Sequence, residues 1–553
     1  MPERGEPRAR LARWRADALE VATALLPLAR CVARERQIAG APGFPLDDSW
    51  IHLHFARNLA AGAGFSYNPG IPVAGSTAPL WTLLLGAGAA VASPSLAMAK
   101  AVGVAATLAA ALLTRRAAVA WGAPAGVALI ASIAFTWVGP VAWGALSGME
   151  VSLAALLVAA ALLAHAHDRP LGRARAALAC AACAALAVLA RPEALLLAPF
   201  LAAARPLTAR RVALFAIVTI AAVTPAVLFS LWTAGTPYPA TAAAKVQGGL
   251  VGWLGGVREP AALMFAGRPL AFFKEWIVWL ATIHWLLPVA LAAALALVWR
   301  RAGRPLGLVS LALVAHPLGM ALLAPYRGPG FQEGRYSIHL LPLVAVTLAV
   351  ALGGWRRGAE WVLDQLRHPL ARSRLCEPRT GRGGSTPMVG SPPGPVAPTA
   401  RWHGRAAAIG AGVWLALAIA ALVPAATRYA WGVQNINAMQ VHLGRWVDAE
   451  LPKTARLALN DIGAIAFFSR REVIDLMGLV TPEIIPYRRR GEAGVIEYVS
   501  ETCPEYVIIF PAWFPRLAAS RETLEPIYRV RLVRNEVAGA EEMVVYRLLR
   551  CAV

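Results

Sequence analysis

The chain has 553 residues, of which 58% are hydrophobic and only 15% are charged, whereas an average soluble domain carries about 25% charged residues. This composition excludes an ordinary soluble globular protein and indicates a membrane protein. The formal net charge of +22 would suggest nucleic acid as a partner of a soluble protein, but the arginines cluster between apolar runs and lack interleaved aromatic residues. We therefore predict no nucleic-acid partner and interpret the basic excess as a topology signal, since short loops rich in Lys and Arg stay cytoplasmic.

Apolar stretches long enough to cross a bilayer recur along most of the chain. Because one crossing needs about 20 mainly apolar residues, the sequence predicts an α-helical polytopic membrane protein with about eleven transmembrane helices. No cleavable signal peptide is expected, since the basic N-terminus precedes a weak apolar run without a clear small-residue cleavage site. The predicted spans are residues 17–34, 96–114, 124–142, 149–166, 174–190, 192–204, 211–232, 274–299, 306–325, 335–354 and 405–428.

A cytoplasmic N-terminus places all the arginine clusters on the cytoplasmic side. These clusters are Arg115 with Arg116, Arg169 with Arg173 and Arg175, Arg205 with Arg210 and Arg211, Arg300 with Arg301 and Arg304, and a larger group from Arg356 to Arg405. The threading requires the short apolar stretch from Pro79 to Val91 to be a juxtamembrane or re-entrant helix. Residues 40–95 then form the first outer loop of a transmembrane module that covers residues 1–428.

Two further segments have a composition of their own. Residues 355–404 are rich in Pro, Gly, Ser and Arg, so we expect a disordered cytoplasmic loop. Residues 429–553 are less apolar and predict a soluble α/β domain with at least five strands, which the last span places on the outer side. The predicted strands lie in the runs ARLALND, REVIDLM, EYVIIFP, YRVRLV and MVVYRLL. Cys503 and Cys551 both lie in this domain and would be able to pair in an oxidising compartment.

The first outer loop contains a pair of adjacent carboxylates, Asp47 and Asp48. Asp47 is able to cap the helix that follows, but a pair does more than a cap requires. Carboxylates in a partly dehydrated cleft suit a general base or the ligands of a divalent cation such as Mg²⁺, Mn²⁺ or Ca²⁺. His52 and His54 are two residues apart, which turns them to different sides of a helix, so we predict substrate contacts rather than joint metal binding.

The other outer turns carry cations and further acids near the membrane, where ionisable residues are few. These are Glu150, Arg191, Glu193, Lys245 and Arg335. A structural role for Glu150 is equally open, because a helix dipole also favours Glu in the first turn. The Arg and Lys residues suit an anionic phosphate head group, and with the carboxylates they predict a lipid-phosphate substrate.

Several catalytic motifs are missing from the sequence. G-x-x-x-x-G-K, H-E-x-x-H and G-x-S-x-G do not occur. Their absence argues against an ATP-driven pump, a zinc protease and an α/β-hydrolase.

The run DDSWIHLHFARNLAAGAGFSYNPGIPVAGSTAPLW resembles the first-loop signature of the GT-C superfamily of membrane glycosyltransferases. SGMEVSLAALL, ARPEALLLAP, GRYSIHLLPL and LNDIGAIAFFSRREVIDLMGLVTPEI are similar to further blocks of its bacterial branch around the mycobacterial terminal arabinofuranosyltransferase. The resemblance covers residues 40 to 485 in the same order.

This resemblance implies a sugar donor carried on a polyprenyl phosphate and an acceptor hydroxyl on an envelope glycan, lipid or protein. Transfer, with inversion, would occur on the outer side of a bacterial plasma membrane. Asp47 would be the general base, Asp48 would support it or help to hold a divalent cation, and Glu150 would be a second catalytic acidic residue. Arg191, Lys245 and Arg335 would contact the donor phosphate. The remaining expected substrate-binding residues are His52, His54, Arg57, Asn58, Glu193 and Tyr336.

Two other function classes remain open. A transporter or flippase of lipid-linked saccharides would carry ionisable residues through the middle of the membrane, whereas here they cluster at the outer ends. A non-catalytic envelope scaffold would tolerate the loss of Asp47, which the enzyme would not.

Overall fold

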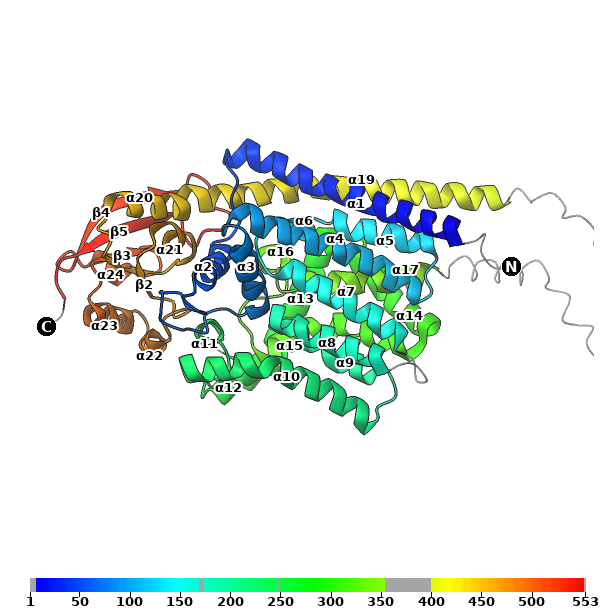
Figure 1. Cartoon of the computed structure of the whole chain (residues 1–553), viewed down its shortest axis with the longest axis horizontal. Coiled ribbons are helices and arrows are strands. Elements are labelled where there is room, and N and C mark those ends of the chain that lie inside the picture. Colours follow the sequence, from blue (N-terminus) through cyan, green and yellow to red (C-terminus); the bar gives the residue numbers. More distant parts are fainter. Residues whose placement is uncertain (1–5, 169–173, 247, 354–398, 552–553) are drawn as a thin grey trace, which may run out of the picture.

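The computed structural model describes residues 6–168, 174–246, 248–353 and 399–551. Helices account for most of these residues, and a five-stranded sheet lies in the C-terminal part. The molecule is elongated, with the sheet at one end and the first residues of α19 (Thr399–Ile436) at the other (Figure 1). Of the loop predicted at residues 355–404, residues 355–398 lie outside the described part of the chain, as do Arg169 and Arg173.

The helical part begins with α1 (Glu6–Ala39), α2 (Asp48–Ala60), α3 (Pro79–Val91), α4 (Leu96–Ala120), α5 (Ala125–Trp137), α6 (Gly139–Leu146), α7 (Val151–His167) and α8 (Ala174–Ala190). It continues with η1 (Pro192–Leu197), α9 (Ala198–Ala203), α10 (Ala209–Ala234), α11 (Ala240–Lys245), α12 (Gly249–Leu254), η2 (Leu263–Gly267) and α13 (Arg268–Ile283). The last elements before α19 are α14 (Leu287–Ser310), α15 (Ala312–Leu323), α16 (Phe331–Gly334), η3 (Ile338–Leu340) and α17 (Leu341–Gly353).

Five helical stretches in the described part are long and apolar enough to cross a membrane. They are Leu96–Ala120, Ala209–Ala234, Leu287–Leu323, Phe331–Gly353 and Ala416–Glu450. The pair α5 and α6, bent by 62°, makes a sixth if it counts as one span, and four shorter apolar helices accompany them. A multi-pass membrane protein is therefore supported, while the number of about eleven spans stays a prediction.

Helix α1 contains the first predicted span, and its acidic side chains are paired. Glu20 is fully buried and accepts a hydrogen bond of 2.7 Å from Arg115 of α4. Glu35 accepts hydrogen bonds from Lys100 at 2.7 Å and from the hydroxyl of Tyr429 in α19 at 3.2 Å. Because a charge at membrane depth is costly unless it is paired, these contacts explain how α1 can pack there against α4 and α19.

The predicted span at residues 274–299 is wrong as one continuous helix. His284 adopts an extended conformation (φ −160°, ψ 124°) between α13 and α14, so the helix breaks there. A second break lies inside α14, where Gly303 has φ 63° and ψ −164°, a conformation that glycine adopts readily. The chain turns at Gly303, and α15 packs against α13.

The short helix predicted from Pro79 to Val91 is confirmed as α3. Its 13 residues would extend only about 20 Å, less than the hydrocarbon core of about 30 Å. It packs against α2 at the same end of the molecule as the sheet (Figure 1). Both helices belong to the first outer loop.

The C-terminal domain follows α19 without an interruption of the helix. The chain passes from α19 through η5 (Asn437–Val441) into α20 (His442–Glu450), which packs on the domain. The remaining helices of the domain are α21 (Gly463–Ser469), η6 (Pro482–Ile484), α22 (Ile485–Arg488), α23 (Glu492–Thr502) and α24 (Pro515–Ala519).

All five predicted strand segments contain a strand. The strands are β1 (Arg456–Leu459), β2 (Glu472–Asp475), β3 (Tyr506–Ile509), β4 (Leu524–Arg531) and β5 (Glu542–Leu548), in the spatial order β2-β1-β3-β5-β4. β1 pairs in parallel with β2 and β3, whereas β5 pairs antiparallel with β3 and β4. Neighbouring residues of a strand point to opposite faces of the sheet. Both faces of this sheet are buried.

The two faces of the sheet pack against different helices. Leu457 and Leu459 of β1 belong to the core that includes α20 and α21, whereas Ala458 belongs to the core that includes α23 and α24. The first of these cores also contains Ile51 and Phe55 of α2. The first outer loop and the C-terminal domain therefore share one hydrophobic core.

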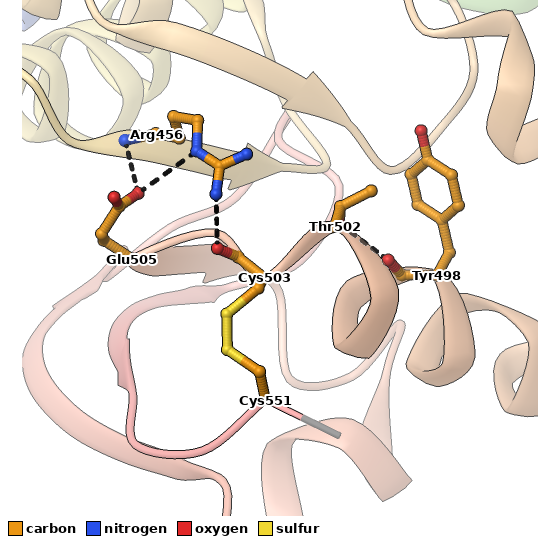
Figure 2. Close-up of a disulfide and its surroundings, with 6 residues drawn as sticks. All are labelled: Arg456, Tyr498, Thr502, Cys503, Glu505 and Cys551. Atoms are coloured by element: carbon orange, nitrogen blue, oxygen red, sulfur yellow. Dashed lines mark hydrogen bonds and ion pairs between the residues drawn. A yellow bond between two sulfur atoms is a disulfide. The ribbon is translucent and has the colours of Figure 1, made fainter. Parts of the chain in front are cut away.

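Cys503 and Cys551 form a disulfide bond, a pairing that the sequence left open (Figure 2). The bond joins the end of α23 to the chain after β5, 48 residues further on. Arg456 of β1 donates a hydrogen bond of 2.8 Å to the carbonyl of Cys503, and its backbone amide donates one of 2.9 Å to Glu505 (Figure 2). The disulfide thus joins the segment before β3 to the segment after β5, and these two strands are neighbours in the sheet.

We expect the double variant Cys503→Ser, Cys551→Ser to melt at a lower temperature than the wild type. Opening a loop of this length adds entropy to the unfolded chain and costs about 4 kcal/mol in the loop-entropy model. Thermal unfolding of the purified protein in detergent measures the change. A thiol reductant should lower the melting temperature of the wild type and leave the variant unchanged, and equal melting of both proteins would contradict the prediction.

Candidate active site

Two adjoining cavities lie between the outer ends of the helices and the C-terminal domain. The helix-side cavity, of about 170 Å³, is lined by Glu150, Arg191 and Thr241 among other residues. The domain-side cavity, of about 770 Å³, is lined by Asp47, Asp461 and Trp513 among other residues. Asp48, Lys245, Tyr326, Arg335 and Leu479 line both. These five residues form the junction of the two cavities.

The junction holds one carboxylate between two cations. Arg335, which follows α16, donates a hydrogen bond of 2.8 Å to Oδ2 of Asp48, the first residue of α2. Lys245, the last residue of α11, places its Nζ 4.0 Å from the same oxygen. Burial raises the pKa of Asp48, but the charges of Lys245 and Arg335 together outweigh burial and hold this pKa well below its usual range. Two positive charges against one negative charge leave a net positive junction.

The helix-side cavity contains a second ion-pair group. Glu150, the residue before α7, bonds to Arg191, and Arg191 also lies 3.3 Å from Glu193. His52 of α2 faces Glu150 at 3.5 Å. The guanidinium of Arg191 lies 4.7 Å from the ring centre of Tyr336, which fixes its plane.

The structure therefore brings most of the predicted site residues together. Those that line at least one cavity are Asp47, Asp48, His52, Glu150, Arg191, Glu193, Lys245, Arg335 and Tyr336. They come from five segments that are far apart in the sequence.

Three predicted substrate-binding residues lie elsewhere and hold the outer loop in place. His54 is buried, stacks on Tyr67, and bonds to the carbonyl of Tyr67 at 2.9 Å. Burial lowers the pKa of His54 to about 3 and the charge of Arg57 acts in the same direction, so the ring is neutral. Arg57 donates to the carbonyl of Phe467, and Asn58 donates to the carbonyl of Tyr67 at 2.7 Å. None of these three residues lines the helix-side cavity or the domain-side cavity.

Asp47 binds the C-terminal domain instead of capping its own helix. Its side chain forms no capping hydrogen bond with α2. Its two oxygens accept hydrogen bonds from the backbone amides of Gly463 at 2.6 Å and Ala464 at 2.8 Å, at the start of α21. The first amides of a helix have no partner within the helix, and the helix dipole favours an anion there. Asp47 thus joins the first outer loop to α21.

Glycine is required at position 463 by this close approach. A side-chain carbon at Gly463 would lie 2.1 Å from the carbonyl oxygen of Asp47. Burial raises the pKa of Asp47 well above its usual range and the neighbouring Asp461 adds to this, while the two amides oppose it.

The carboxylate of Asp461 belongs to the site, although the sequence favours a helix cap over a functional role for this residue. It lies in the turn between β1 and α21 and lines the domain-side cavity. Gln440 donates a hydrogen bond of 2.7 Å to its Oδ2. The signal that could have found it is its position directly after a parallel strand, where ligand-binding residues of α/β sheets collect.

The residues present do not fit the divalent cation predicted at Asp47 and Asp48. Both oxygens of Asp47 already accept backbone hydrogen bonds, and Oδ2 of Asp48 lies beside two cationic side chains. Within the described ranges, no group of three or more His, Cys, Asp or Glu residues could hold a metal ion. We derive no catalytic step through one.

Solved structures of other proteins share the fold of this chain. The chain is similar to the crystal structure of ArnT from Cupriavidus metallidurans bound to undecaprenyl phosphate, with 13% identity, a TM-score of 0.53, and coverage of 94% of this chain and 97% of that chain. The fold is GT-C-like. The chain is also similar to the archaeal oligosaccharyltransferase AglB from Archaeoglobus fulgidus, in complex with an inhibitory peptide and a dolichol-phosphate, with 12% identity, a TM-score of 0.52, and coverage of 92% and 73%.

Sequence comparison adds one family match. Residues 434–546 match DUF8728, a domain family of unknown function, so the match covers the C-terminal domain. No curated protein matches the chain.

We expect Gly463→Ala to lower the melting temperature of the protein, because the new methyl group would push α21 away from Asp47. The shift would also break charge-assisted hydrogen bonds, and loss of such a cap costs about 0.5–2 kcal/mol. Gly126→Ala is the matched control, since a side-chain carbon there meets nothing within 4 Å. Thermal unfolding of both variants tests the expectation, and a Gly463→Ala protein as stable as the control would refute it.

Proposed function

We propose that this protein is a membrane glycosyltransferase that moves a sugar from a polyprenyl-phosphate donor to an acceptor hydroxyl on the outer side of a bacterial plasma membrane. The observation that carries the proposal is the net positive junction formed by Lys245 and Arg335 around Asp48. The phosphodiester of a polyprenyl-phosphate sugar carries one negative charge, which would balance the net single positive charge of the junction. Arg suits phosphate oxygens because it can donate two parallel hydrogen bonds.

An apolar groove beside the helix-side cavity supports a lipid-linked donor. It has a volume of about 230 Å³ and is lined by residues of α3, α8 and α10, including Leu80, Leu189 and Phe229. Ser76 lines both this groove and the helix-side cavity. A prenyl chain in the groove would therefore reach the cations with its phosphate end. Undecaprenyl phosphate and dolichol-phosphate, which two structures of the same fold contain, are ligands of this chemistry.

The charges of the junction would act on the leaving group. As the bond between the sugar and the phosphate oxygen breaks, negative charge grows on the phosphate. Arg335 and Lys245 would stabilise the transition state, in which this charge has grown, more strongly than they stabilise the bound donor. This difference is what accelerates a reaction. Asp48 would hold both cations in position before the donor arrives. Glu150 would do the same for Arg191.

Two observations support the orientation that we propose. Arg115 pairs with Glu20 in the N-terminal half of α1, and this half of α1 lies at the end of the bundle away from the sheet (Figure 1). Clusters of Arg favour the cytoplasmic side, and the Cys503–Cys551 disulfide favours an oxidising compartment for the domain. We therefore place the N-terminus in the cytoplasm and the C-terminal domain outside. The resemblance in sequence adds an acceptor hydroxyl on an envelope glycan, lipid or protein to the proposal.

The first test is the binding of undecaprenyl phosphate to the purified protein in detergent. We expect Arg335→Ala to weaken binding about 10- to 100-fold, because a hydrogen bond to a charged group contributes about 1.5–3 kcal/mol. Lys245→Ala should weaken binding less, because a lysine acts on a phosphate as a point charge, whereas an arginine can donate two parallel hydrogen bonds. Lys453→Ala, which removes a lysine from the exposed surface of the C-terminal domain, is the control and should bind as the wild type does.

The second test is sugar transfer by the wild type, offered a panel of polyprenyl-phosphate sugars and a mixed envelope-glycan acceptor. Release of undecaprenyl phosphate together with a glycosylated acceptor would establish the enzyme. Movement of the intact donor between leaflets without release would favour a flippase. A wild type that neither binds nor consumes any donor would leave the scaffold as the better explanation.

A further inference from the structure

The carboxyl ends of the parallel strands β1 and β3 face the domain-side cavity. β1 is flanked by β2 on one side and by β3 on the other. The chain leaves β1 through α21 on one face of the sheet and reaches β3 through α23 on the other face. In an open α/β sheet such a reversal is a topological switch point, and ligands bind in the crevice outside the carboxyl ends of the strands there.

The residues that follow β1 and β3 occupy this crevice. Asn460 and Asp461 come directly after β1, and Trp513 comes after β3. All three line the domain-side cavity. The side chain of Asn460 accepts a hydrogen bond of 3.0 Å from the amide of Phe510, which ties the two strand ends together. Trp513 is 42% exposed, so its ring is free to contact a ligand in the cavity.

Asp461 differs from Asp47 in keeping one oxygen without a hydrogen bond, and from Asp48 in having no cationic side chain paired with it among the described residues. Both oxygens of Asp47 are taken by α21, and Asp48 is held by the cations. Asp461 accepts one hydrogen bond, from Gln440 to Oδ2. Within the described part of the chain, no donor is bonded to its Oδ1. This oxygen is therefore available to a hydroxyl group that enters the cavity.

We propose that Asp461 is the general base of the transfer, and that the C-terminal domain thus supplies a catalytic residue to the site. This inference rests on the proposed function. The acceptor hydroxyl oxygen would form a bond to the anomeric carbon while its proton passes to Oδ1 of Asp461. The bond from the anomeric carbon to the phosphate oxygen would break, and its electron pair would leave on the phosphate beside Arg335 and Lys245. Asp47 would be a positioning residue, since it holds α21 next to Asp461.

The surroundings of Asp461 suit this role. Burial raises its pKa to about 6, the hydrogen bond from Gln440 lowers it, and the charges of Asp48 and Asp475 raise it. Asp47 is the other carboxylate whose charge acts on this group. A base is most effective when its pKa lies near the working pH, and at neutral pH Asp461 is ionised yet more basic than Asp48.

The test compares Asp461→Asn with the wild type in sugar transfer and in binding of undecaprenyl phosphate, from pH 5 to pH 8. Removal of a general base typically lowers the rate about 100- to 10,000-fold. We expect a loss of kcat in this range with lipid binding within about twofold of the wild type. The wild-type rate should fall as the pH drops below about 6, because a protonated carboxyl group cannot accept a proton, and this acidic limb should vanish in Asp461→Asn.

Asp448→Asn is the matched control for the loss of a carboxylate in the same domain. Asp448 pairs with Lys453 and with Arg471, and it lines neither the helix-side nor the domain-side cavity, so its variant should keep the rate and the pH profile of the wild type. In Asp461→Ala, added formate can occupy the vacated space and accept the proton. Recovery of transfer with formate would support a base that is missing rather than a domain that is misfolded.

Three results would overturn the inference. The first is an Asp461→Asn protein that keeps more than a third of the wild-type rate, and the second is one whose residual rate keeps the acidic limb. The third is an Asp461→Ala protein that binds undecaprenyl phosphate normally but is not rescued by formate. Failure of the proposed function has a different signature, because the wild type itself would then neither bind nor consume a donor, and the inference would fall with it.

Discussion

The contact between Asp47 and the N-terminus of α21 joins the two halves of this protein. The carboxylate occupies the position where a helix leaves its first amides without partners, and Gly463 allows the two backbones to approach closely. Around this polar contact, Ile51 and Phe55 of α2 enter the hydrophobic core of the sheet domain. Because Asp48 is the next residue along the chain, the docking of Asp47 also determines where Asp48 lies. The rest of the site depends on this placement.

The charges of the site come from segments that only folding brings together. Arg191, Lys245 and Arg335 line the helix-side cavity, where a lipid phosphate would enter, and Lys245 and Arg335 also reach the domain-side cavity. The carboxylates Asp47 and Asp461 lie on the domain side, where an acceptor would arrive from the solvent. Asp48 stands between them and lines both cavities. A buried charge is costly without a partner, so each of these groups is held by an opposite charge, an amide or a hydrogen-bond donor.

Paired charges also organise the helical part of the molecule. Glu20 with Arg115 and Glu35 with Lys100 join α1 to α4, away from both cavities. These pairs explain why a first helix with several ionisable residues can pack within an apolar bundle.

The sequence by itself determined the class of the fold, because apolar stretches and arginine clusters are local properties. The first predict helices that cross a bilayer, and the second predict which loops stay on the cytoplasmic side. It also predicted the five strands, whose hydrophobic runs are equally local, and it selected Asp48, Lys245 and Arg335 as site residues. The helix break at His284 was not predicted, since an extended residue inside an apolar run leaves no clear mark on hydropathy. The break at Gly303 lies in the basic loop predicted between the spans at residues 274–299 and 306–325.

Only the tertiary structure decided the roles of the individual acids. Asp47 and Asp461 are more than 400 positions apart in the sequence, yet both line one cavity. Asp47 reaches it because its side chain binds the backbone amides of α21. His54, Arg57 and Asn58 belong to the same polar run as Asp48, but the turns of α2 direct them to the backbone of the outer loop and of Phe467. Sequence adjacency cannot show this, because the environment of a side chain is made by segments that the chain brings together only on folding.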